Sequence, residues 1–303
     1  MSGEPLLIIG TGAMACLFAS RLAAAGVPAI LLGTWQAGLE ALRRDGVRVQ
    51  TADGEQVYPV QVATSPAQCS GTRHALVLVK SWQTARAAAQ LAQCLAPDGL
   101  ALTLQNGLGN QEILTKALGA KRVALGVTTS GATLVEPGLV RPAGEGTTSL
   151  GAHPRIEPLA ALLRQVGFAV EIVPETGDLL WSKLVINAAI NPLTALLRVP
   201  NGELAARPSA RTLMTAAARE AATVAAALDH HLTYDDPAAA AEGVARRTAT
   251  NHSSMFQDVL RGAPTENDAI GGAIVAAAEK HAIPTPVNRT LWLLVRAVTE
   301  KGA

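Results

Sequence analysis

Cysteine, aromatic residues and excess charge are all scarce in this sequence. The three cysteines, Cys16, Cys69 and Cys94, are odd in number and far apart, which argues against a disulfide framework and favours a reducing compartment. Basic residues number 25 and acidic residues 24, with no long basic run. The sequence therefore has no basic cluster of the kind that binds nucleic acid or an anionic membrane surface.

Membrane-spanning and secretory signals are also missing. No run approaches the ~18 uninterrupted apolar residues that a transmembrane helix needs. No basic residue precedes Arg21, so the N-terminus lacks the charged start of a signal peptide. We expect a soluble cytoplasmic protein, and the 49% of hydrophobic residues indicates a large core.

The first half of the chain alternates short aliphatic runs with helical patterns, which is typical of a parallel sheet covered on both faces. After Pro174 the strand-like runs stop and Ala- and Leu-rich helical patterns take over. We expect an α/β fold: a Rossmann-type, doubly wound NADP-binding domain at 1–175, followed by an all-helical substrate and catalytic domain at 176–303. The expected strands are 6–9, 29–32, 75–79, 101–104, 123–127, 148–150 and 169–173. The expected helices are 13–25, 38–45, 82–95, 110–118 and, more roughly, 178–197, 208–229, 237–249, 264–281 and 286–300.

A glycine turn, GTGAMA at residues 10–15, follows the first expected strand and opens a helix. This is the context that a dinucleotide-binding fingerprint requires, with Ala15 in its third position. The first glycine permits a tight turn, the second lets the backbone approach a pyrophosphate, and the helix N-terminus presents N–H groups to the anion. The alternative is an ordinary strand–helix turn. The expected cofactor-binding residues are Gly10, Thr11, Gly12, Ala13 and Met14.

The end of the second strand, AILLGTWQ, has no acidic residue. Folds that bind NAD usually place Asp or Glu there to hold the ribose hydroxyls, and without that carboxylate nothing repels the 2′-phosphate of NADP. Thr34 occupies the position, with Arg43 and Arg44 further along. The sequence therefore favours NADP.

Two more strands end in polar residues. LVLVKSWQ places Lys80 after one strand, and LTLQNGLGN places Asn106 after the next. Ligands of doubly wound sheets bind beyond the carboxyl ends of the strands, so we expect both side chains to face one crevice with the glycine turn. Simple capping of each strand is the alternative.

A polar stripe crosses an otherwise apolar helical pattern after residue 177. Lys183, Asn187 and Asn191 recur at intervals of four, so they stay within ~80° of one another on one helix face. A solvated face is the alternative, but asparagine is a poor helix former and the flanking residues are apolar. Buried amides need partners, because an unpaired one costs ~1–3 kcal/mol, and a polar ligand would provide them.

Together these stretches resemble the ketopantoate reductase (2-dehydropantoate 2-reductase) family. The stripe lies in WSKLVINAAINPLTALLRVPNGEL, and LVKSWQ, LQNGLGN and NHSSMFQDVLRGAPTEND, residues 251–268, are similar to the family's other blocks. The resemblance implies a Rossmann domain and a helical domain with catalysis in the cleft between them. It also implies reduction of a 2-keto acid by NADPH, in the first place ketopantoate on the route to pantothenate.

The resemblance also implies residue roles. Lys183 is the implied proton donor, and Glu266, the second implied catalytic residue, lies beside the nicotinamide end of the cofactor. Asn106 contacts cofactor and substrate, and Lys80 helps to hold the adenylate end. Thr34 stands where many members have an arginine for the 2′-phosphate. The implied substrate-binding residues are Asn106, Lys183, Asn187, Asn191 and Ser254.

Lys183 suits the chemistry of such a reduction. Hydride transfer to a ketone leaves negative charge on oxygen, which a positioned cation stabilises and then protonates. A lysine of ordinary pKa, near 10.4, is a weak acid at neutral pH, so we expect closure of the cleft to desolvate Lys183 and lower that pKa, while a nearby Glu266 opposes the shift.

Other interpretations stay open. The chain could be a paralogous 2-keto acid or 3-hydroxyacid dehydrogenase of the same architecture, although the paired asparagines and SSMFQD argue against the latter. A non-catalytic NADP-sensing protein is a third possibility, which the presence of Lys183 and Glu266 disfavours. Without the family match, helix-dipole stabilisation in a first turn would explain Glu266. The histidines, including the pair His230–His231 expected on a helix, show no metal-ligand spacing, so we expect no metal and, as partner, only a small-molecule 2-keto acid, in a monomer or homodimer.

Overall fold

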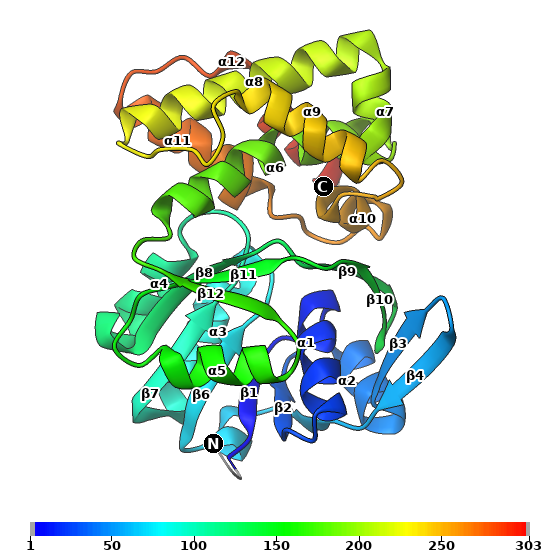
Figure 1. Ribbon diagram of the computed structural model, residues 1–303, viewed down its shortest axis with the longest axis vertical. Coiled ribbons are helices and arrows are strands. Elements are labelled where there is room, and N and C mark those ends of the chain that lie inside the picture. Colours follow the sequence, from blue (N-terminus) through cyan, green and yellow to red (C-terminus); the bar gives the residue numbers. More distant parts are fainter. Residues whose placement is uncertain (1–3, 301–303) are drawn as a thin grey trace. The chain divides into compact units, whose positions relative to one another are not determined.

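The chain divides into two compact units in the computed structural model, which describes residues 4–300 (Figure 1). The first unit comprises residues 4–105 and Asn110–Thr176, and the second comprises Asn106–Gly109 and residues 177–300. The first is built on a largely parallel sheet and the second is helical, so the expected α/β fold class is confirmed. The short segment Asn106–Gly109 groups with the helical unit, although it interrupts the first unit in the sequence.

The main sheet of the first unit contains β1 (Leu6–Ile9), β2 (Ala29–Leu32), β5 (Gln61–Ala63), β6 (Thr72–Val77), β7 (Leu95–Thr103), β8 (Val123–Thr128), β11 (Thr147–Gly151) and β12 (Ala169–Val173). Their order is β12-β11-β8-β7-β6-β1-β2-β5. The neighbours from β5 to β8 pair in parallel, whereas β11 pairs antiparallel with β8. In register, Ile9 at the end of β1 lies opposite Leu32 and Val77, so the strands flanking β1 end beside the turn that follows it.

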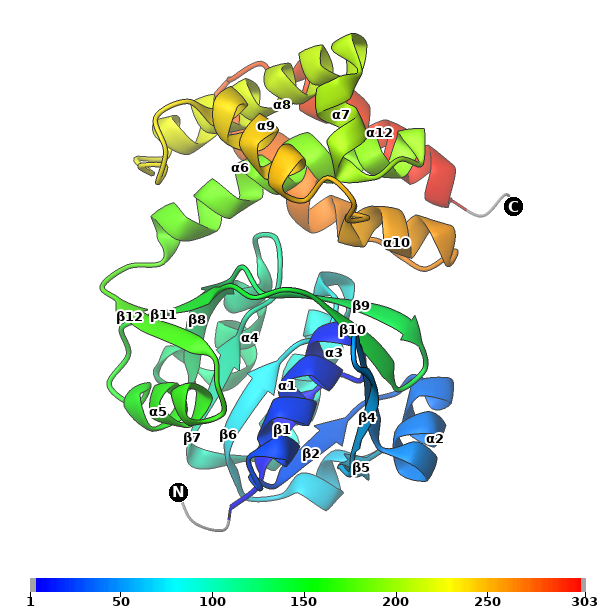
Figure 2. The ribbon, with the colours of Figure 1, turned by 45° about the vertical axis from the view of Figure 1, so that its right-hand side comes forward.

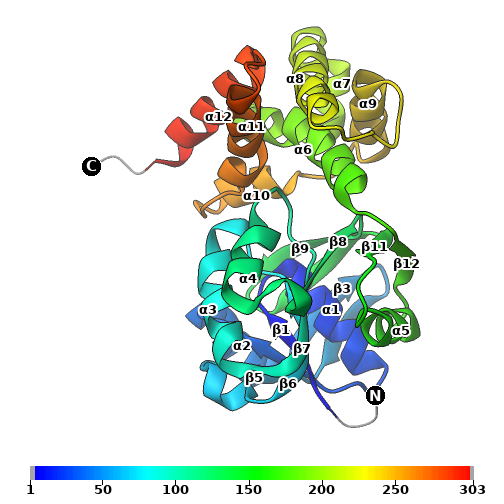
Figure 3. The same cartoon turned by 90° about the vertical axis from the view of Figure 1, so that its left-hand side faces the viewer.

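Period-two alternation distributes the strand residues between two cores. Leu6 and Ile8 pack into one core with α1 (Ala13–Ala24) and α5 (Glu157–Gln165), whereas Leu7 and Ile9 pack into the other with α3 (Thr84–Cys94) and α4 (Asn110–Leu118). Figure 3 shows the two helix pairs on opposite sides of the sheet. The remaining helical elements of this unit are α2 (Gln36–Asp45) and the 3₁₀ turns η1 (Pro66–Cys69), η2 (Ser81–Gln83) and η3 (Ala120–Arg122).

A second sheet lies beside α1 (Figure 2), and the sequence analysis did not predict it. It runs β4-β3-β10-β9, formed by β3 (Val47–Thr51), β4 (Gly54–Tyr58), β9 (Gly131–Glu136) and β10 (Leu139–Gly144). Val47, Val49 and Val140 join the core on the α1 side of the main sheet. Most of β4 is exposed and polar, so the aliphatic run that marks a buried strand is absent there.

The second unit is organised around α6 (Gly177–Leu197), which packs against α8, α9, α10 and α12. By length and composition α6 could cross a membrane, but 67% of its most apolar window is buried inside the protein, as is typical of a core helix. The other elements are α7 (Asn201–Ala206), α8 (Pro208–Ala227), α9 (Pro237–Arg247), α10 (Ser254–Leu260), the π-helical turn η4 (Asp268–Gly272), α11 (Ala273–Lys280) and α12 (Pro286–Thr299).

Two local expectations in this unit were wrong. The helix expected over 264–281 begins with the π-helical turn at Asp268, so Glu266 precedes the helix instead of lying in its first turn. His230 and His231 lie in the loop after α8, where the Asp178 carboxylate accepts a hydrogen bond from the His231 N–H and lies 3.2 Å from Nδ1 of His230. Helices α5, α7 and α10 were not predicted.

Candidate functional site

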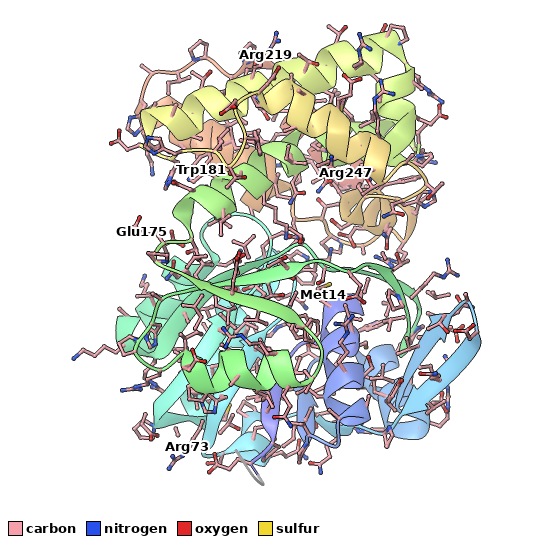
Figure 4. All side chains as sticks on the ribbon, in the orientation of Figure 1. Met14, Arg73, Glu175, Trp181, Arg219 and Arg247 are labelled. Carbon is pink, nitrogen blue, oxygen red and sulfur yellow. The ribbon has the colours of Figure 1, made fainter. Side chains whose placement is uncertain are left out.

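The glycine turn lies between β1 and α1. Gly10 has φ +131°, and a Cβ there would lie 3.1 Å from the carbonyl oxygen of Leu78, so this position requires glycine. Gly12 is the N-cap of α1 and has no side chain to cap the N–H groups of the first turn. A Cβ on Gly12 would meet nothing within 4 Å, so the chain is not packed against this face of the turn. Met14, labelled in Figure 4, belongs to the same first turn.

The strands that flank β1 place two more of the expected cofactor-binding residues at this edge of the sheet. Thr34 is exposed just beyond β2, and the partly buried Lys80 immediately precedes η2 after β6. The turn packs directly on the β2 end, since a Cβ on Gly33 would lie 2.7 Å from the methyl group of Thr11. Uncapped helix N–H groups after a glycine turn, with a lysine at the end of the neighbouring strand, fit a dinucleotide pyrophosphate.

A buried polar network, which the sequence analysis missed, fixes the two residues that bracket Asn106–Gly109. The Gln105 Nε2 donates to the Val79 carbonyl at 2.9 Å and to Thr84 Oγ1 at 2.8 Å. Thr84 Oγ1 in turn hydrogen-bonds Asn110 Oδ1 at 2.7 Å. All three side chains are buried, and the signal in the sequence is the polar pair Gln105–Asn106 directly after an apolar strand.

Lys183, Glu266 and Asn106 come together within the second unit. Burial lowers the pKa of Lys183 to about 8, and the nearby Glu266 carboxylate opposes that shift, as expected from the sequence. The Asn106 Nδ2 donates to Glu266 Oε2 at 3.2 Å, and the Glu266 side chain is buried, with 5% exposure. The arrangement places a lysine with a pKa of about 8 near a carboxylate that accepts a hydrogen bond from an amide.

The polar stripe of α6 carries amides that lack protein partners. Asn187 is partly buried and Asn191 is 6% exposed, yet neither side chain forms a hydrogen bond with any of residues 4–300. Amides in such surroundings normally find partners, because an unmade bond costs ~1–3 kcal/mol. Donors and acceptors of a small polar ligand would satisfy both.

Ser254, the third expected substrate-binding residue outside the Lys183 cluster, is the first residue of α10, and its side chain also forms no hydrogen bond within the described chain. The preceding residue fixes its place. Ser253 Oγ accepts a bond from the Phe256 N–H at 3.1 Å and bonds Thr194 Oγ1 of α6 at 2.7 Å. Because Thr194 lies three residues after Asn191 in α6, the start of α10 is tied to α6 within a turn of Asn191.

One further polar side chain was not singled out from the sequence. Asn201, at the start of α7, donates from Nδ2 to Thr248 Oγ1 at 2.8 Å, but its buried Oδ1 accepts no bond within residues 4–300. Its position in RVPNGEL, directly after Pro200, is the available signal. Across the same residues, no cluster of three or more His, Cys, Asp or Glu side chains could hold a metal ion.

The expected site residues thus form two groups. Gly10, Thr11, Gly12, Ala13, Met14, Thr34 and Lys80 lie at one edge of the sheet in the first unit. Asn106, Lys183, Asn187, Asn191, Ser254 and Glu266 lie in the second unit. That both groups face a single crevice stays a prediction.

Two family models match the chain in succession. Residues 6–155 match the model described as ketopantoate reductase PanE/ApbA, and residues 177–299 match ketopantoate reductase PanE/ApbA C terminal. The chain is 37% identical to the 2-dehydropantoate 2-reductase of Halobacterium salinarum and 38% identical to that of Archaeoglobus fulgidus. Each alignment covers 98% of this chain and 99% of the relative.

Solved structures agree with these matches. A PanE/ApbA family ketopantoate reductase from Ralstonia eutropha JMP134 superposes with a TM-score of 0.90 at 32% identity, over 98% of both chains. A D-mandelate dehydrogenase with NADH and anilino(oxo)acetate has the same TM-score of 0.90 at 24% identity, covering 97% of this chain and 98% of the dehydrogenase. At that identity the second match supports the fold alone.

Proposed function

The chain belongs to the ketopantoate reductase family, and we propose that it reduces the 2-keto acid ketopantoate to pantoate with NADPH. The observation that carries this proposal is the α6 stripe. It presents a lysine of lowered pKa one turn from the amide of Asn187 and two turns from that of Asn191, and neither amide forms a hydrogen bond with any of residues 4–300. A ligand with a carbonyl, a hydroxyl and a carboxylate would match these groups.

We propose that the first unit holds the cofactor. The N–H groups after Gly12 would hold its pyrophosphate, and Lys80 would lie at the adenylate end. The absence of an acid at the end of β2 supports NADPH, while Thr34 in place of an arginine predicts a weaker preference than a cationic side chain would give. Bound NADPH supplies the hydride.

Lys183 would complete the reduction by donating its proton to the carbonyl oxygen. A pKa of about 8 leaves the ammonium mostly protonated at pH 7, yet makes it a stronger acid than an ordinary lysine. Glu266 keeps the ammonium charged until the oxygen takes the proton, and Asn106 orients Glu266 through their hydrogen bond. Asn187, Asn191 and Ser254 would hold the substrate's hydroxyl and carboxylate.

We assign NADP binding to residues 1–175 and substrate binding with catalysis to residues 176–303, to which Asn106 adds its side-chain amide. The enzyme would act in the cytoplasm on a small-molecule substrate, as a monomer or homodimer.

Steady-state kinetics with a panel of 2-keto acids test the proposal. NADPH absorbance would be followed with ketopantoate, its unbranched relatives and an aromatic 2-keto acid, each also with NADH. We expect the highest kcat/KM for ketopantoate with NADPH. A higher value for another keto acid would assign the chain to a paralogous dehydrogenase, and NADPH binding without turnover of any substrate would indicate a sensor.

A further inference from the structure

The segment Asn106–Gly109 docks against the region around η4 at two points within the second unit. The Leu108 N–H donates to the Ala269 carbonyl, inside η4, at 2.9 Å. Two residues earlier in the segment, the Asn106 amide reaches Glu266, which lies two residues before η4. The short stretch from Glu266 to Ala269 therefore accepts hydrogen bonds from both the backbone and a side chain of this segment.

The π-helical geometry explains why a helix carbonyl is available for this contact. A π-helical turn holds one residue more than an α-helical turn, so its carbonyl groups do not align with the usual N–H donors four residues on. Such turns are rare, and they occur frequently at functional sites. Here the Ala269 carbonyl accepts its bond from Leu108, outside the helix.

Gly107 is the point of closest approach. It is buried with φ +82°, and a Cβ there would lie 2.5 Å from the Ala269 carbonyl oxygen and 2.7 Å from the Ala269 Cβ. Both obstacles are rigid, so any other residue would push the segment away from η4. Gly109 offers a contrast, because it has φ +89° but a Cβ there would meet nothing within 4 Å.

We propose that Gly107 and η4 form a positioning device that holds the Asn106 amide against Glu266 and so sets the carboxylate beside the proton donor Lys183. This inference rests on the proposed function, since it assigns Gly107 a role in the same proton transfer. Gly107 touches no reacting atom and acts through Asn106. Its side chain is absent because the Ala269 carbonyl occupies that space.

The matched substitutions Gly107→Ala and Gly109→Ala test the device. Both place alanine in the left-handed region and carry the same backbone strain, but only the first collides with Ala269. We expect Gly107→Ala to lower kcat by roughly 100-fold, the scale of a 1 Å misplacement near the chemistry, with NADPH affinity within about threefold of wild type. Gly109→Ala should keep kcat within about threefold while losing a similar amount of thermal stability.

Hydrogen exchange supplies a readout that does not depend on turnover. The Leu108 amide should be protected in the wild type and in Gly109→Ala, and should exchange freely in Gly107→Ala. A freely exchanging Leu108 amide in the wild type overturns the proposal even if Gly107→Ala does not fold. Equal kcat losses in the two variants, with wild-type turnover intact, overturn the positioning role alone. A wild type that reduces no 2-keto acid overturns the proposed function itself.

Discussion

At the scale of single residues, the charge state of Lys183 should determine how kcat depends on pH. Because a proton donor must be protonated and burial lowers the pKa of Lys183 to about 8, kcat for reduction should be high below pH 8 and fall as the pH rises through that value. Glu266 raises this pKa, so Glu266→Gln should move the fall to lower pH. The measurement is kcat from pH 6 to 10 at saturating substrate.

The control for this profile is Lys183→Ala. It should lose roughly 10²–10⁴-fold in kcat, the usual worth of a general acid, and keep NADPH affinity near the wild-type value. Its residual rate should show no fall near pH 8. If the profile of Lys183→Ala retains the wild-type midpoint, another group supplies the proton.

The side-chain amides of Asn187 and Asn191 in α6 should affect KM for the substrate and not the stability of the fold. Asn187→Ala and Asn191→Ala remove no hydrogen bond within residues 4–300, and alanine is the better helix former, so the free energy of unfolding should stay level or rise. Each should raise KM for the keto acid by roughly 10- to 100-fold, since hydrogen bonds to charged groups contribute ~1.5–3 kcal/mol. Kinetics and urea unfolding of the same preparations provide both values.

Asn288 is the matched control, because it is a buried asparagine with protein partners. Its Nδ2 donates to the Ala217 carbonyl at 3.0 Å and to Glu220 Oε2 at 2.9 Å. Asn288→Ala should therefore lower the free energy of unfolding by ~1–3 kcal/mol and leave KM unchanged. Should Asn191→Ala behave like Asn288→Ala, the α6 amides have a structural role and the substrate lies elsewhere.

At the scale of elements, two helix caps separate stability from function. Asp236 caps α9 by accepting bonds from Ala238 and Ala239 at 2.8 and 3.1 Å, whereas Ser253 caps α10 and also bonds Thr194 of α6. Replacing either with alanine should cost ~1 kcal/mol of stability. Only Ser253→Ala should also raise KM for the keto acid, because Ser254 depends on that link for its place. Equal KM values in the two variants would remove Ser254 from substrate binding.

The elements also show where sequence patterns are informative. β1, β2, β12 and α4 have the boundaries expected from the sequence, because continuous aliphatic runs and helical periodicity mark them directly. The second sheet was missed because its exposed strands hold polar residues and glycine. The π-helical turn was missed because nothing local distinguishes it from an α-helix.

The candidate site also contains residues that the sequence predicts and contacts that it does not. Gly10 and Lys80 lie at strand ends, and the polar residues of the α6 stripe recur at the spacing of a helix. Residue type and position in the pattern therefore identify them as candidates. The docking of Asn106–Gly109 on η4 joins residues 160 positions apart in the case of Asn106 and Glu266, and the sequence carries no local trace of such a pairing. The resemblance to a family pointed to both side chains, but only the structure reveals the role of Gly107 between them.

At the scale of the whole molecule, the cysteines provide a probe of one unit. Cys16, Cys69 and Cys94 are free and buried, and all three lie in the first unit. Burial raises the pKa of Cys16 to about 12 and that of Cys94 to about 11, so few thiolates form in the native state at pH 8. Their alkylation therefore requires this unit to open.

NADPH should slow that alkylation if the first unit holds the cofactor. Binding to the native state alone stabilises it by RT ln(1 + [L]/Kd), so NADPH at 100 times its Kd should slow labelling by about 100-fold. The rate of alkylation would be followed with a fluorogenic maleimide at pH 8, and chain unfolded in urea, where all three thiols react quickly, sets the upper limit. A labelling rate unchanged by saturating NADPH would mean that the glycine turn before α1 does not hold the nucleotide, because Cys16 lies in α1 with its thiol directed at the Thr11 carbonyl of that turn.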